Sequence, residues 1–286
     1  MAATDDSPAL RSVEAARPQL ELSGPKLAAA LETLIERTEA HGGVERFVAA
    51  LQVKGALFRD ALAAGKVKEL DLPTFKALCA VMSPVRRRVG DYLLGPAFES
   101  MRTKLMSLLD GAEETGTADR RMAAFCAAFP QDRKHRWVRD LAAEVLHNVD
   151  PERYPLMCRW VWDARSGTGA LREIWHSEDD GYVGIDVADG YGTFVMLREE
   201  LAQFLTANGV FRDVIHYVDL LTAQVYAGYI CEQGGSYLRA DFNAPEDPME
   251  HTRRLLGLDG VNAAGRTRLK CVDGEVFVVD DLKLLG

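Results

Sequence analysis

The chain lacks the features that most directly identify membrane and secreted proteins. Its longest uninterrupted apolar runs are only a few residues long, whereas a transmembrane helix needs about 20. Residues 1–23 are polar and acidic, without the basic-then-apolar order of a secretory signal, and we expect them to form a flexible leader. The five cysteines are scattered and include no Cys-x-x-Cys pair, which favours free thiols in a reducing cytoplasm.

Common catalytic motifs are also absent. The sequence contains no Gly-x-Ser-x-Gly elbow, no His-Glu-x-x-His zinc motif and no Gly-Lys-Ser/Thr phosphate loop. It has no internal repeat and no low-complexity tract. The motifs therefore name no reaction, and we assign the chain to no family from them.

The charge of the chain is unevenly distributed. The 286 residues are 48% hydrophobic and 27% charged, as in a soluble globular protein, and their net charge is −9. Residues 119–172 carry ten basic and seven acidic side chains, whereas residues 173–259 carry five basic and sixteen acidic ones. The acidic total argues against non-specific nucleic-acid binding, and the local basic excess favours an anionic ligand or an acidic partner.

Apolar residues at three- and four-residue spacing predict a mainly α fold, an irregular helical bundle. Ser23 and Pro25 predict a helix start, as does Asp71, and one helix over 84–111 is expected to kink at Gly95-Pro96. We expect a small β element with short strands near 182–196 and a C-terminal hairpin over 266–280, around Asp273-Gly274. The predicted division is a leader over 1–23, an N-terminal helical module over 24–110 and an α+β functional domain over 119–286.

The segment 133–176 is the predicted functional region. It holds all four tryptophans, three of the six histidines and eight basic residues, which are side chains suited to recognition. Its Gly-Thr-Gly sequence, between two arginines, is compatible with an anion-binding nest, although a plain tight turn is favoured. The residues predicted to bind an anionic small molecule or an acidic protein partner are Arg133, Arg136, Trp137, Arg153, Arg159, Trp160, Trp162 and Arg165. One of Trp160 and Trp162 is expected to be buried and the other to lie at an interface.

A carboxylate precedes four of the six histidines by three residues, whereas composition predicts about one such pair. On a helix, residues three apart share a face and can bind the same metal ion. The alternative prediction is therefore a non-haem oxidoreductase that binds iron or manganese, ions suited to carboxylate-rich sites. Its candidate ligands are Glu144, His147, Glu173, His176, Asp213 and His216.

Three classes of function are left open by the sequence. The favoured class is a soluble, cytoplasmic, helical binding or regulatory protein that uses residues 133–176. The metal-dependent oxidoreductase is the alternative, and whether the chain is an enzyme stays undecided. A nucleic-acid-linked role through the basic run 133–139 ranks last because acidic residues surround that run.

Overall fold

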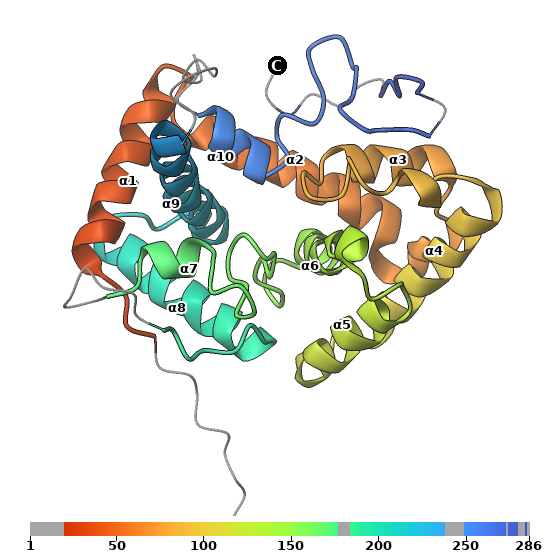
Figure 1. The fold of residues 1–286 in the computed structure, drawn as a ribbon. Coiled ribbons are helices and arrows are strands. Elements are labelled where there is room, and N and C mark those ends of the chain that lie inside the picture. The colour runs from red at the N-terminus through yellow and green to blue at the C-terminus, as the bar shows by residue number, and fades with distance from the viewer. Residues whose placement is uncertain (1–19, 177–183, 238–248, 273, 280–283, 285–286) are drawn as a thin grey trace, which may run out of the picture.

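The computed structural model describes residues 20–176, 184–237, 249–272, 274–279 and 284. Over these residues the chain is mainly helical, which confirms the predicted class. Figure 1 shows two groups of helices, with α1, α7, α8 and α9 on one side and α3, α4 and α5 on the other. The helices are α1 (Gly24–Glu39), α2 (Val44–Leu62), α3 (Leu72–Ala80), α4 (Gly95–Leu109), α5 (Ala118–Ala127), α6 (Trp137–Val149), α7 (Ala170–Glu173), α8 (Tyr191–Ala207), α9 (Val214–Tyr237) and α10 (Glu250–Leu255).

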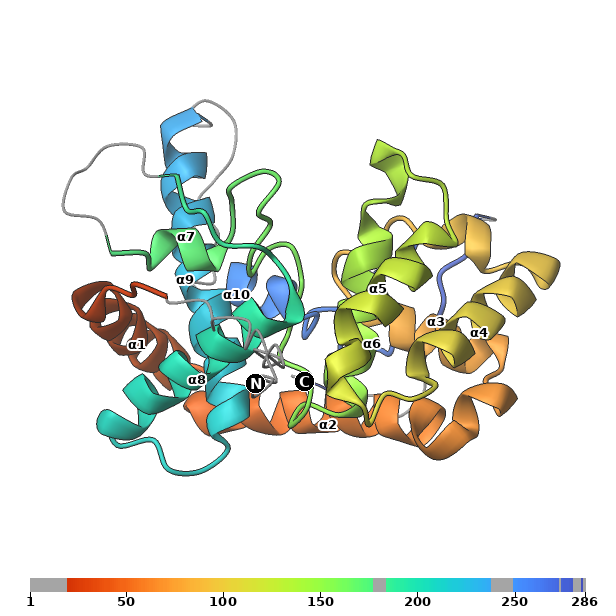
Figure 2. The same cartoon turned by 90° about the horizontal axis from the view of Figure 1, so that it is seen from below.

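Helix α2 connects the two groups. It runs beneath both of them in Figure 2 and packs against α6 and α9 as well as against α1 and α3. Its inner face carries Phe47, Leu51 and Phe58, which are buried and recur at helical spacing. One hydrophobic cluster therefore includes residues on both sides of 110–118. The domain division suggested at that point stays a prediction.

Local sequence signals set several helix starts. Helix α1 begins directly after Ser23 with Pro25 in its first turn, and the Asp71 side chain caps α3 by accepting a hydrogen bond from the Thr74 amide at 2.8 Å. These two predictions are confirmed. Residues 1–19 of the predicted leader lie outside the described residues.

The end of that leader is ordered by pairing. Leu22 and Trp175 form an antiparallel bridge, and the Ser23 amide donates to the Ile174 carbonyl at 2.8 Å. The segment that precedes α1 is thereby attached to the end of the segment 133–176.

The prediction of a single kinked helix over 84–111 is wrong. Residues 84–88 form turns, and α4 begins at Gly95. A proline in the first helical turn loses no hydrogen bond, because the first amides of a helix have no partner within it. The Gly95-Pro96 sequence therefore starts a helix here.

The expected small β element is not confirmed, because no sheet is found among the described residues. Residues 191–196 belong to α8, where buried Phe194, Leu197, Leu201 and Leu205 follow a helical period that overrides the local β-branched residues. Residues 182 and 183 lie outside the described part.

The C-terminal segment makes only isolated bridges, such as Arg266 with Val278. Two other backbone amides of this segment donate to residues outside the predicted hairpin. The Lys270 amide donates to the Arg86 carbonyl, and the Arg268 amide donates to the Gly260 carbonyl. Asp273, in the predicted hairpin turn, lies outside the described residues. The two ends of the predicted hairpin do pair at this bridge, since the Thr267 amide donates to the Phe277 carbonyl and the Val279 amide to the Gly265 carbonyl, but the pairing does not extend into a sheet among the described residues.

Candidate functional site

Buried charged and polar side chains join α2 to α6. The Lys54 ammonium group donates to Glu144 Oε2 at 2.8 Å and to the carbonyl oxygen of Leu256 at 2.8 Å. Asn148 donates to the same carboxylate oxygen at 3.0 Å. The Lys54 and Glu144 side chains are 3% and 0% exposed, so the two charges compensate each other inside the protein. This pair fixes the position of α2 against α6.

A second buried pair joins α6 to α9. His147 Nε2 donates to Asp219 Oδ2 at 3.0 Å, and His147 Nδ1 donates to the carbonyl oxygen of Tyr154 at 2.8 Å. His216 lies three residues before Asp219, and burial lowers the pKa of its imidazole. The cavity beside His147 and Asp219 has a volume of about 20 Å³, which is room for about one water molecule. This space is too small for a substrate.

The predicted iron or manganese ligands are distributed over α6, α7, α9 and the loop positions His176 and Asp213. Glu144 binds Lys54, Asp213 Oδ1 accepts a hydrogen bond from Gln52 at 2.8 Å, and His176 is exposed. Within the described ranges, no group of three or more His, Cys, Asp and Glu side chains could hold a metal ion. The predicted set, Glu144, His147, Glu173, His176, Asp213 and His216, stays a hypothesis from the sequence.

A hollow of about 330 Å³, which we call the arginine pocket, lies where the start of α6 meets the end of α5 and the loop before α7. In Figure 2, α5 and α6 run close to each other. The pocket is lined by cationic side chains from positions distant in the sequence, together with three aspartates. The charged and polar residues of this set are Arg136, Arg139, Arg159, Arg165, His135, Asp132, Asp163 and Asp189.

Two arginines of this pocket are held from behind by buried carboxylates. Arg159 donates to Asp140 Oδ2 from Nε at 3.0 Å and from Nη2 at 2.6 Å, and Arg136 Nη2 donates to Asp163 Oδ2 at 2.7 Å. The Asp140 and Asp163 side chains are 2% and 6% exposed, whereas those of Arg159 and Arg136 are 26% and 41% exposed. Burial raises the pKa of Asp140, and the Arg159 guanidinium opposes that shift. The guanidinium groups are therefore partly exposed, whereas the carboxylates that bind them are buried.

The Gly-Thr-Gly sequence forms a tight turn, as favoured from the sequence. Thr168 and Asp163 form a bridge, and the amides of Ser166 and Thr168 donate to the Asp163 carbonyl. Gly169 has φ +134°, and a Cβ there would lie 2.6 Å from the Val161 carbonyl oxygen. Because these amides are used within the turn, the loop serves mainly to place the exposed Arg165 at the pocket.

The three tryptophans predicted to contact a ligand lie in the core. Trp137, Trp160 and Trp162 are all buried, so the expectation that one of the last two would lie at an interface does not match their positions. Trp162 Nε1 donates to the carbonyl oxygen of Val187 at 3.0 Å, and this bond ties the segment before α8 to the pocket region. The tryptophans support the arginine pocket from within rather than lining it.

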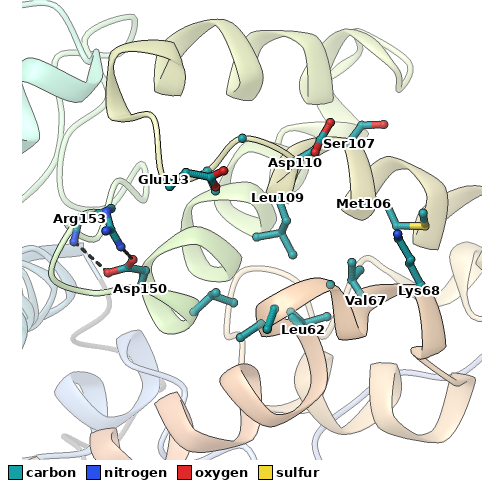
Figure 3. Close-up of a pocket in the computed structure, with 16 residues that line it drawn as sticks. Leu62, Val67, Lys68, Met106, Ser107, Leu109, Asp110, Glu113, Asp150 and Arg153 are labelled. Atoms are coloured by element: carbon teal, nitrogen blue, oxygen red, sulfur yellow. Dashed lines mark hydrogen bonds and ion pairs between the residues drawn. The ribbon is translucent and has the colours of Figure 1, made fainter.

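Two predicted binding arginines lie outside the arginine pocket. Arg133 is exposed and does not line it, while Arg153 lines a separate and larger cavity of about 660 Å³ (Figure 3). Asp150 forms an ion pair with Arg153 there, and the carboxylates Asp110 and Glu113 line the same cavity. The carboxyl ends of α2, α4 and α6 also meet at this cavity, and helix carboxyl ends disfavour anions. The large cavity therefore does not fit an anionic ligand.

Some residues of the arginine pocket were missed by the sequence reasoning. Arg139 lies three residues after Arg136, so helical spacing could have placed both on one face. Asp189 and Asp140 had no local signal, because their roles depend on contacts with Arg139 and Arg159 from other parts of the chain.

Comparison with protein-family models, with curated proteins and with solved structures finds no match. A search of the described helices finds none with both the length and the apolar character required to cross a membrane.

Proposed function

We propose that this chain is a binding protein that recognises the anionic group of a small molecule in the arginine pocket. The observation that carries the proposal is the arrangement of Arg136 and Arg159, whose guanidinium groups are partly exposed in front of buried carboxylates. A carboxylate that holds a guanidinium from behind fixes its orientation before a ligand arrives, which lowers the entropic cost of binding.

Free hydrogen-bond donors are present in the pocket. Among the described residues, Arg136 donates only from Nη2, and Arg159 uses Nε and Nη2 but not Nη1. Arg165 is exposed and makes no hydrogen bond or ion pair with the described part of the chain. Planar guanidinium groups with unused N–H bonds match the two oxygens of a carboxylate or phosphate group.

The concave shape favours a small molecule over an acidic protein surface. A hollow of about 330 Å³ falls at the lower end of the range for small-molecule sites. The exposed Asp132 and the partly exposed Asp189 would repel the extended acidic face of a protein, whereas a compact anion can approach the arginines selectively.

The test is isothermal titration calorimetry with inorganic phosphate and acetate on the full chain. Arg165→Ala should weaken binding about tenfold, because a charge-assisted hydrogen bond contributes about 1.5 kcal/mol or more. The matched control is Arg133→Ala, which removes an equally exposed arginine outside the pocket and should leave affinity within about twofold. Equal effects of the two variants, or no binding of either anion, would overturn the proposal.

The iron- or manganese-dependent alternative is tested separately. Metal content of the protein purified without a histidine tag, after growth with both metals, should approach one equivalent if that alternative holds. A content far below one equivalent would reject it.

A further inference from the structure

A second hollow adjoins the arginine pocket. It has a volume of about 180 Å³, and we call it the methionine hollow because Met122 and Met157 line it. Three residues, Cys126, Arg139 and Asp189, line both spaces. The two hollows are therefore neighbours separated by shared side chains.

An ion pair between Arg139 and Asp189 lies between the two hollows. Arg139 Nη1 donates to Asp189 Oδ2, and Arg139 Nη2 donates to the Asp189 carbonyl oxygen at 2.8 Å. Both side chains are partly exposed, at 24% and 30%, and ion pairs with this exposure contribute little to stability. A ligand anion can thus replace the Asp189 carboxylate on Arg139 without a large loss of folding energy.

Besides the charged Asp119, Arg139 and Asp189, the methionine hollow is lined by apolar side chains and a thiol. Met122 and Met157 are largely buried in the protein body, and their flexible thioether side chains adapt to ligands of different shape. Ala123 adds a small exposed side chain, and burial raises the pKa of the Cys126 thiol, which keeps that group neutral. The polar group Asp119 is already engaged, because its Oδ1 accepts a hydrogen bond from the Tyr191 amide at 2.8 Å.

We propose that the two hollows form one groove for an amphiphilic carboxylate, with its carboxylate on the arginines and its aliphatic or aromatic tail over Met122 and Met157. This inference rests on the proposed anion-binding function and adds the chemical class of the ligand. The head replaces Asp189 as the partner of Arg139, and the tail enters the space beyond the ion pair.

The experiment is a calorimetric titration of the full chain with acetate, butanoate, hexanoate and octanoate, and with inorganic phosphate. Affinity should rise about fourfold for each methylene group that the methionine hollow buries. Ala123→Leu fills this hollow from an exposed position and should abolish the gain with chain length, while acetate and phosphate bind as before. Ala124→Leu is the matched control, since Ala124 is equally exposed but lines neither space, and it should keep the gain.

The outcomes separate the two proposals. Acetate binding with no gain in the longer acids, or a gain that survives Ala123→Leu, overturns the groove and leaves the anion-binding function standing. Failure of both acetate and phosphate to bind overturns the anion-binding function and the groove with it. A further variant, Asp189→Asn, removes the carboxylate that competes with the ligand for Arg139, and it should bind hexanoate several-fold more tightly. Weaker binding of hexanoate by this variant would contradict the proposal that the ligand replaces Asp189 on Arg139.

Discussion

The imidazole of His147 donates from both ring nitrogens, to the carboxylate of Asp219 at 3.0 Å and to the Tyr154 carbonyl at 2.8 Å. Both acceptors are oxygens without a proton when Asp219 is ionised, so this geometry requires a doubly protonated ring. Burial by itself lowers the pKa of His147, but the Asp219 charge, the two hydrogen bonds and the charge of Glu144 together raise it above the ordinary value. Burial lowers the pKa of half-buried His216, and the nearby charge of His147 lowers it further against the opposing effect of Asp219.

The free energy of unfolding should decrease as pH rises above about 6.5, the pKa of histidine in an unfolded chain. A pKa raised by folding contributes stability that is complete below the unfolded pKa and is lost as pH rises through the folded pKa. Urea denaturation of the native protein and of His147→Gln from about pH 6 to about pH 8 measures this effect. The variant should lose the pH-dependent part, whereas His216→Gln should keep it. A native protein whose stability stays constant or rises over this range would contradict the assignment.

Removal of Lys54 should strongly destabilise the protein. In Lys54→Met the Glu144 carboxylate, which is fully buried, loses its counter-charge, and the expected loss is about 3–5 kcal/mol. The double variant Lys54→Met, Glu144→Leu should recover much of this loss, because it leaves no buried charge. Denaturation by urea gives both values. The control is Glu99→Gln in the exposed pair with Arg102, expected to change stability by less than about 1 kcal/mol. A double variant as unstable as Lys54→Met would argue against an ion pair as the cause.

Two glycines should respond oppositely to alanine. At Gly257, φ is +74° and a Cβ would lie 1.9 Å from the Val81 carbonyl oxygen, so Gly257→Ala should cost about 2 kcal/mol or more. At Gly228, within α9, a Cβ would meet no atom within 4 Å, and Gly228→Ala should stabilise the helix by about 0.5–1 kcal/mol. Thermal unfolding of the two variants gives the signs. A neutral Gly257→Ala would mean that the segment after α10 does not pack on the turn after α3.

Two tryptophans provide a matched test of the bond that supports the pocket. Trp162→Phe loses the hydrogen bond to the Val187 carbonyl, worth about 1 kcal/mol, in addition to packing. Trp160→Phe loses packing alone, because its buried Nε1 has no partner among the described residues. Trp162→Phe should therefore be the less stable variant. The reverse order of stability would contradict the role of this bond.

Signals contained within a few residues predicted the local structure well. Ser23, Pro25 and Asp71 marked helix starts that the structure confirms, because capping and proline effects act within one turn. The prediction of a β element was not confirmed at residues 191–196, where a preference for strand competed with a helical apolar period. Residues 191–196 include β-branched side chains, but the apolar period of α8 continues to Leu205 and buries more surface as a helix.

The binding role of residues 133–176 stays a prediction. Three of the arginines predicted there, Arg136, Arg159 and Arg165, line one pocket. Arg153 belongs to the same segment, yet it lines the cavity of about 660 Å³. Helix α6 lies between Arg136 and Arg153 in the sequence and places them at its opposite ends. The tryptophans of the segment are buried, since large rings gain most from the core.

The sequence by itself determined the helical class, several helix starts and the concentration of cationic side chains in one segment, since each depends on composition or on neighbours within one or two turns. Only the tertiary structure decided the partners of the charged groups. Lys54 reaches Glu144 over 90 residues of sequence and His147 reaches Asp219 over 72, while Arg139 meets Asp189 over 50. Such contacts depend on how whole helices pack, because burial in a shared core brings together side chains that no local pattern connects.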